Sequence, residues 1–106
     1  MTGAAGGDGW ALTLYISGAS PRSIEAIEAV RRVCDEELGR RVDLEVIDVQ
    51  RQPALGARDQ IIVVPTLIKR LPAPLRRIVG DLADPARLRR GLDLGPAEVG
   101  RPNPDA

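Results

Sequence analysis

The chain has 106 residues, a length that fits one domain with a modest core. Its single cysteine, Cys34, and its lack of histidine exclude an internal disulfide, a C-x-x-C redox pair and a Cys/His metal site. The formal net charge is zero, and Trp10 and Tyr15 are the only aromatic residues. Both features argue against nucleic-acid binding.

No stretch reaches the ~20 apolar residues of a membrane span, and the first nine residues lack the basic and apolar regions of a signal peptide. We therefore expect a cytoplasmic protein with no membrane anchor. Acidic residues dominate positions 25–48 and basic residues dominate positions 69–90. This distribution is typical either of two solvated faces or of a dipolar surface that orients a protein partner.

The first half of the chain predicts a strand, a helix and a second strand. We expect disorder in residues 1–10 and a folded domain in residues 11–94, followed by a disordered Pro/Gly-rich tail, 95–106. Ser20 as N-cap, Pro21 at the first helical position and Gly39 at the end delimit the helix. Its inward apolar stripe comprises Ile24, Ile27, Val30, Val33 or Cys34, and Leu38. Cys34 on this stripe is expected to be buried and inert.

Apolar residues alternate from Trp10 to Ile16, and the nearly continuous run at residues 46–49 is typical of a buried parallel strand. Strand, helix and strand in this order make a βαβ unit. Residues 50–60 allow only a short, weak helix, because Gly56 costs ~1 kcal/mol relative to alanine.

The β-branched, apolar run at residues 61–68 predicts a strand buried on both faces. Pro65 interrupts this run and cannot donate to a ladder, so it must stand at the beginning of the strand, at a bulge or at an edge. The Val64-Pro65 bond is a candidate cis peptide bond. We place Pro65 at the opening of the third strand.

The remainder predicts a hairpin and a last helix. Leu71-Pro72-Ala73-Pro74 must turn, and residues 75–79 then pair antiparallel with the preceding strand. Asp84 caps a helix that Pro85 starts, and Gly91 is expected just past its end. The predicted order is therefore β-α-β-α-β-β-α.

This order, with the hydrophobic-Pro-Thr sequence at Pro65, resembles the α/β thioredoxin-like fold. Redox-active members carry C-x-x-C where this chain has Ser20-Pro21-Arg22-Ser23. A serine hydroxyl without a histidine base has neither the acidity nor the redox chemistry of a thiol. We therefore interpret Ser20 as a cap and Ser23 as a surface or helix-start residue, and expect a binding protein with no enzymatic activity and no cofactor.

A more specific resemblance covers roughly residues 11–94, nearly all of the predicted folded part of the chain. The chain resembles the KaiB family of circadian clock proteins in six blocks, in order: Leu14-Tyr15-Ile16-Ser17-Gly18, Val46-Ile47-Asp48-Val49, Pro65-Thr66-Leu67, Leu71-Pro72, Arg76-Arg77-Ile78-Val79-Gly80-Asp81-Leu82 and Gly91-Leu92-Asp93-Leu94. The resemblance implies a non-enzymatic protein that docks on the KaiC ATPase ring and modulates its phosphorylation cycle. It also implies a second half that interconverts between a thioredoxin-like and a tetramer-forming arrangement.

The resemblance also assigns residues and partners. Lys69, Arg76 and Arg77 are the predicted partner-binding residues, and the predicted fold-switch residues are Pro65, Gly91 and Asp93. A SasA-like histidine kinase is a further expected partner, and a homo-oligomer, dimer or tetramer, is allowed. Two alternatives stay open: a thioredoxin-fold ligand-binding or redox-type protein that has lost its C-x-x-C and uses Ser20, Ser23 and Pro65, and a SasA-like sensor domain.

The chain departs from the cyanobacterial members at two places. Val63-Val64 stands where those members usually have Ala-Thr, and β-branched residues favour a strand over a helix there. We therefore predict that the thioredoxin-like state is preferred even without a partner. Asp43 and Glu45 stand where Ala and Lys are usual on the KaiA-facing edge, and this reversed charge argues against capture of KaiA.

Overall fold

The computed structural model describes residues 9–39 and 41–94. Its elements follow the predicted order, with a short π-helical turn, η1, after the first helix. They are β1 (Trp10–Ile16), α1 (Pro21–Val33), η1 (Cys34–Leu38), β2 (Val42–Asp48), α2 (Pro53–Arg58), β3 (Thr66–Leu71), β4 (Arg76–Val79) and α3 (Pro85–Gly91). The fold is thioredoxin-like, as predicted, and the tetramer-forming alternative stays a prediction.

The predicted terminal segments lie mainly outside the described residues. The boundary at residue 10 is wrong, because Trp10 begins β1 and its backbone N–H donates to the carbonyl of Arg41 at 2.7 Å. None of the helices in the described ranges has the length and apolar character needed to span a bilayer.

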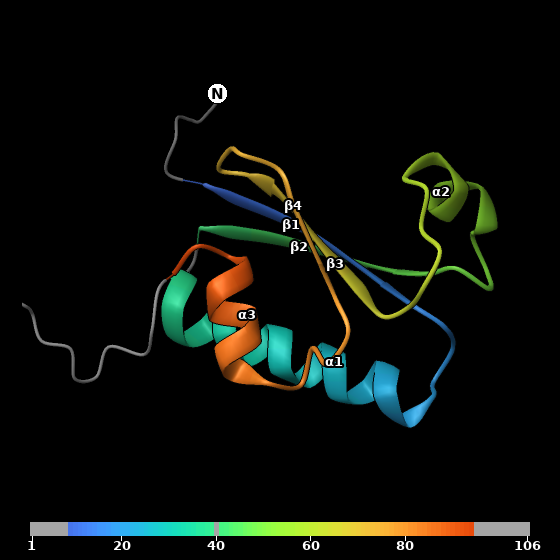
Figure 1. Ribbon diagram of the computed structural model, residues 1–106, viewed down its shortest axis with the longest axis horizontal. Helices are drawn as coiled ribbons and strands as arrows, with labels where there is room; N and C mark the ends of the chain where they lie inside the picture. Colours follow the sequence, from blue (N-terminus) through green and yellow to red (C-terminus); the bar gives the residue numbers. More distant parts are fainter. Residues whose placement is uncertain (1–8, 40, 95–106) are drawn as a thin grey trace, which may run out of the picture.

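The four strands form one sheet in the order β2-β1-β3-β4 (Figure 1). Strands β1 and β2 are parallel, as the βαβ unit predicts, whereas β3 is antiparallel to both β1 and β4. The β2 strand lies at an edge, and only Ile47 of its residues is buried. The expectation that this parallel strand is buried is therefore wrong except at Ile47, because β2 has a neighbour on one side only.

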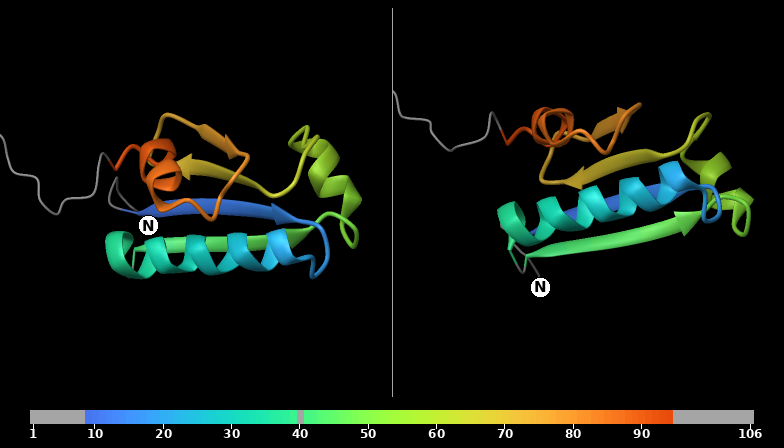
Figure 2. Two further views of the ribbon diagram at one scale, coloured as in Figure 1. Left: turned by 60° about the horizontal axis from the view of Figure 1, so that its bottom comes forward. Right: turned by 90° about the horizontal axis from the view of Figure 1, so that it is seen from below.

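Helices α1 and α3 cover one face of the sheet, and α2 lies near one end of the opposite face (Figure 2). The larger core, between the sheet and α1 and α3, includes Leu12, Leu14, Ile16, Ala26, Val30, Val33, Cys34, Leu38, Leu67, Ile78, Leu82, Leu88 and Leu92. The smaller core, on the α2 side, consists of Tyr15, Ile47 and Ile68, flanked by Val49, Leu55, Ile61 and Val64. Alternate residues of β1 and β3 therefore contribute side chains to the cores on both faces of the sheet, as the two-residue period of a strand requires.

The start of α1 confirms Ser20 as N-cap, since its hydroxyl accepts from the backbone N–H of Ser23 at 3.2 Å. Two details differ from the prediction. Ile24 is exposed, whereas Ser23 is buried because its hydroxyl is bonded to the Ser20 hydroxyl at 2.9 Å and to the N–H of Ser17 at 3.1 Å. Only the first two turns of the inward stripe are shifted by one position, to Ser23 and Ala26, whereas Val30, Val33 and Leu38 are buried as predicted. Hydrogen bonding makes a serine acceptable at the inward position. Cys34 is buried as predicted, and burial is the main cause of its raised thiol pKa.

The predicted strand at residues 61–68 is only partly present. Strand β3 begins at Thr66, directly after the buried Pro65, and the Val64-Pro65 bond is cis. Pairing between β1 and β3 ends at Tyr15 and Thr66, so residues 61–64 have no strand beside them. A β-branched sequence without a pairing partner therefore remains irregular, which corrects the prediction of a strand buried on both faces.

Gly91 is the last residue of α3 and not the residue after it, so its predicted place is corrected. A Cβ at this position would lie 2.5 Å from Cδ1 of Ile78 on β4. Glycine is therefore needed because α3 approaches the strand closely. The left-handed residue that ends the helix is Asp93, with φ 62°.

We expect Gly91→Val to lower the free energy of unfolding by about 1–3 kcal/mol, because the added side chain overpacks the contact with Ile78. The matched control is Ala86→Val, an exposed position on the same helix, which should cost about 0.5 kcal/mol through helix propensity alone. Urea denaturation measures both. Equal losses in the two variants would contradict the close-approach explanation.

Candidate partner-docking surface

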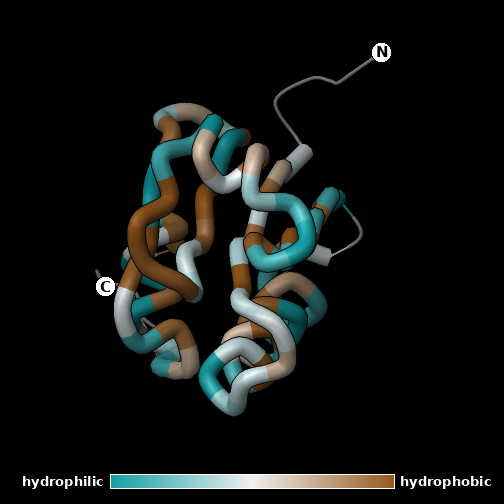
Figure 3. Tube along the Cα trace, turned by 90° about the vertical axis from the view of Figure 1, so that its right-hand side faces the viewer, coloured by the Kyte–Doolittle hydropathy of each residue, from teal (hydrophilic) through white to brown (hydrophobic). Residues whose placement is uncertain are grey.

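Three large hydrophobic side chains are exposed at one end of the sheet. Ile62 is 92% exposed and Val63 is 52% exposed, and Val79 of β4 is also exposed. Thr66 pairs with Val79 in the β3–β4 register, and its hydroxyl donates to the Val63 carbonyl at 2.6 Å. We call Ile62, Val63 and Val79 the apolar patch. Figure 3, seen from the α2 end, shows hydrophobic stretches of chain beside hydrophilic turns.

The sequence did not reveal the apolar patch, because a run of four β-branched residues is typical of a buried strand. The two ends of this run, Ile61 and Val64, are partly buried against the smaller core, and the two residues between them are exposed. Clustered apolar side chains held at the surface by ordered neighbours are typical of interaction sites. The only sequence signal that residues 61–64 lie outside the strand was Pro65, which limits where the strand can begin.

Lys69 does not lie on the surface. Its side chain is 1% exposed, and its Nζ donates to the Pro72 carbonyl at 2.8 Å, lies 3.4 Å from Oδ2 of Asp93 and stands 5.8 Å from the centre of the Trp10 ring. Arg76 Nε reaches the same Asp93 oxygen at 3.2 Å. In this arrangement Lys69 connects the hairpin to the end of α3, and its role in partner binding stays a prediction.

Asp93 combines an ion pair with a strained backbone. Helix α3 ends in a Schellman motif, in which the N–H of Asp93 donates to the Arg90 carbonyl and that of Leu94 to the Arg89 carbonyl. The position after such a helix end favours glycine, yet aspartate stands there with φ 62°. The hydrogen bond from Arg76 is the main cause of the lowered pKa of the Asp93 carboxyl. The unfavourable backbone conformation of Asp93 and its favourable ion pairs oppose each other, which is compatible with the predicted role of this residue in fold switching. That role stays a prediction.

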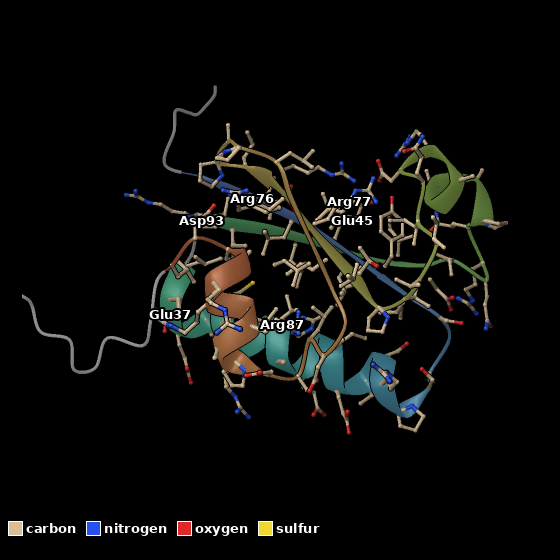
Figure 4. The ribbon with its side chains drawn as sticks, in the orientation of Figure 1. Glu37, Glu45, Arg76, Arg77, Arg87 and Asp93 are labelled. Atoms are coloured by element: carbon tan, nitrogen blue, oxygen red, sulfur yellow. The ribbon has the colours of Figure 1, made fainter. Side chains whose placement is uncertain are left out.

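Arg77 lies on the opposite face of β4 from Arg76, because neighbouring residues of a strand alternate. Figure 4 shows Arg76 beside Asp93, whereas Arg77 lies nearer to α2. Arg77 is exposed, and its Nη2 donates to the backbone carbonyl of Asp59. The structure therefore separates the three predicted bases: Arg77 shares the sheet end with the apolar patch, whereas Lys69 and Arg76 face α3.

The residues of the ligand-binding alternative do not form a reactive site. Pro65 is one wall of a cavity of about 250 Å³ that is also lined by Arg22, Glu25 and residues 80–83, but neither Ser20 nor Ser23 lines it. Both serine hydroxyls are occupied by the start of α1. Within residues 9–39 and 41–94 no cluster of His, Cys, Asp or Glu could hold a metal ion.

We expect Asp93→Asn to lower stability at neutral pH, because asparagine tolerates the left-handed backbone but removes the charge that faces Lys69 and Arg76. The folded-state pKa of Asp93 lies below its ordinary value of 3.8. The difference in free energy of unfolding between the wild-type protein and the variant is therefore fully present above that value and disappears as pH falls through the folded-state pKa. Urea midpoints between pH 2 and 7 measure it. A difference that is independent of pH would show that charge is not the cause.

The KaiB domain model matches residues 13–94. The chain is 47% identical over 85 residues to the circadian clock protein KaiB3 of Synechocystis sp., covering 80% of this chain and 83% of the relative. It is 46% identical over 83 residues to the circadian clock oscillator protein KaiB of Synechococcus sp. strain RCC307, covering 78% and 76%.

Solved structures support the fold. The N-terminal domain of Synechococcus elongatus SasA has a TM-score of 0.67 at 24% identity, covering 92% of this chain and 95% of that domain. A thioredoxin from Malassezia sympodialis has a TM-score of 0.66 at 20% identity, covering 84% and 76%. At these identities the likeness concerns the fold alone, whereas the family match covers most of the domain. The chain belongs to the KaiB family.

Proposed function

We propose that this chain is a cytoplasmic, non-enzymatic clock protein that docks on a KaiC-type ATPase ring and modulates its phosphorylation cycle. Membership of the KaiB family supports this role, since relatives at 41–47% identity are named circadian clock proteins. The serine turn in place of C-x-x-C also fits a binding protein.

The observation that carries the proposal is the exposure of Ile62. Ile62 is 92% exposed, although Ile61 and Val64 at the two ends of its segment are partly buried. The fold therefore presents this large aliphatic side chain to solvent, which costs hydration free energy when no partner covers it. Burial against a partner recovers ~25 cal/mol per Å² of that surface. Arg77 on the same sheet end supplies a positive charge beside the patch, so the complementary ring surface is apolar with an acidic edge.

Other partners follow from the same surface. The SasA domain has the same fold, which supports competition between that kind of domain and this chain for one ring surface. Asp43 and Glu45 are both exposed on the edge strand β2. Their negative charge disfavours binding of a KaiA whose surface is complementary to a lysine at this edge. We propose a clock or stress system in which KaiA binding is not used, and a dimer or tetramer remains compatible with the family.

We expect Ile62→Asp to weaken binding to a purified KaiC-type ring with ATP by at least tenfold, because the buried apolar contact becomes a desolvated carboxylate. Ile24→Asp on α1 is the matched control, since Ile24 is also exposed but lies on the other face of the sheet. Size-exclusion chromatography and fluorescence anisotropy measure binding. Unchanged affinity of Ile62→Asp, or an equal loss with Ile24→Asp, would refute this docking surface.

Charge reversal at Arg77 should slow association with the ring several-fold at low salt, and the deficit should shrink as salt screens the interaction. Arg31→Glu, an exposed arginine on α1, changes the net charge equally and is the control. Stopped-flow association rates at two ionic strengths distinguish them. Equal slowing in both variants would indicate a general charge effect and not a contact of Arg77.

A further inference from the structure

A partly buried polar cluster lies directly before the apolar patch. The carboxylate oxygen Oδ2 of Asp59 accepts hydrogen bonds from the Tyr15 hydroxyl on β1 and from Nη2 of Arg70 on β3, the latter at 2.6 Å. Arg70 is in turn fixed by its Nε, which donates to the Thr13 hydroxyl at 2.9 Å. Arg77 on β4 donates to the backbone carbonyl of the same aspartate. Three strands therefore hold one residue, and we call Tyr15, Asp59 and Arg70 the Asp59 cluster.

Asp59 ends helix α2, and the chain changes direction immediately after it. The N–H of Gln60 donates to the Ala57 carbonyl at 3.0 Å and that of Ile61 to the Gly56 carbonyl at 2.8 Å, which is a Schellman motif. Gln60 has φ 57°, although this position favours glycine. The backbone cost of this turn is opposed by the bonds that Asp59 makes to the sheet. The direction in which residues 61–64 leave α2 thus depends on the Asp59 cluster.

Residues 61–64 have few other constraints. They pair with no strand in the described structure, and Pro65 is the next buried residue. The segment is therefore held at its beginning by Asp59 and at its end by Pro65, with Ile61 and Val64 packed inward between them. The exposure of Ile62 and Val63 follows from this attachment at both ends.

We infer that Asp59 and Arg70 are positioning residues for docking: their ion pair, with the Tyr15 hydroxyl, fixes the segment that presents Ile62 and Val63 to a partner. This inference rests on the proposed function. Asp59 acts through the segment, since its side chain is 18% exposed and its carboxylate is occupied within the molecule.

Within the cluster, Asp59 and Arg70 are ionised at neutral pH, whereas Tyr15 keeps its proton and donates it in a hydrogen bond to the carboxylate. The hydrogen bond from Arg70, followed by that from Tyr15, lowers the pKa of the Asp59 carboxyl. Burial is the main cause of the raised pKa of Tyr15, and Asp59 adds to it. Because Tyr15 is the only tyrosine in the chain, its titration reports on the cluster without any partner.

A double-mutant cycle with Asp59→Asn, Arg70→Gln and the double variant tests the inference. Each single change should lower affinity for a KaiC-type ring with ATP by about tenfold, equivalent to 1.4 kcal/mol, and the double variant should lose no more than the weaker single variant. Additive losses would mean that the two side chains contact the ring independently, which would overturn the inference. Single variants that bind normally while Ile62→Asp does not bind would also overturn it and leave the proposed function intact.

Titration of Tyr15, followed by absorbance at 295 nm in the free protein, supplies the second readout. Asp59→Asn should lower the Tyr15 midpoint, because the carboxylate that opposes ionisation is removed. An unchanged midpoint would show that the cluster does not exist in solution and would overturn the inference. If the wild-type protein fails to bind any KaiC-type ring while Asp59→Asn does shift the Tyr15 midpoint, the cluster exists but the proposed function fails. The assignment of Asp59 and Arg70 to docking then fails with it.

Discussion

Two carboxylates attach helices α2 and α3 to the β3–β4 hairpin, and the arrangement of the second half of the chain depends on them. Each stands at the end of a short helix: Asp59 after α2 and Asp93 after α3. The bases of the hairpin alternate between the two faces of the sheet, as strand geometry requires. Lys69 and Arg76 reach Asp93 on one face, and Arg70 reaches Asp59 on the other.

This division would give a physical reason for the predicted rearrangement of the second half. Both helices are short and end in Schellman motifs with non-glycine residues in the left-handed region, Gln60 and Asp93, and each is secured by charged side chains. Partly exposed ion pairs contribute little to stability. Two folds can coexist when their free energies differ by a few kcal/mol, a condition that such attachments satisfy more easily than a large apolar core does. In contrast, α1 packs on β1 through a continuous set of buried aliphatic residues.

Local signals predicted the elements but not the exposure of individual residues. Periodicity and helix punctuation were sufficient for β1, for α1 from Pro21, for the hairpin and for α3 from Pro85, because each depends on neighbours in sequence. Residues 61–64 were misassigned because strand formation needs a partner strand, which the sequence does not show. Gly91 was misassigned because its reason is Ile78 across the core, and the burial of Lys69 depends on Trp10, Pro72 and Asp93, which only the tertiary fold brings together. The Asp59 cluster also joins residues separated by 11–44 positions.

Hydrogen–deuterium exchange of the whole protein, with and without a KaiC-type ring and ATP, tests the central claim most directly. If the second half presents the apolar patch to a partner, amides of residues 60–64 and of β4 become protected on binding, while those of the exposed face of α1 exchange as before. Protection confined to α1 or to the β2 edge, with residues 60–64 exchanging unchanged, would contradict the account.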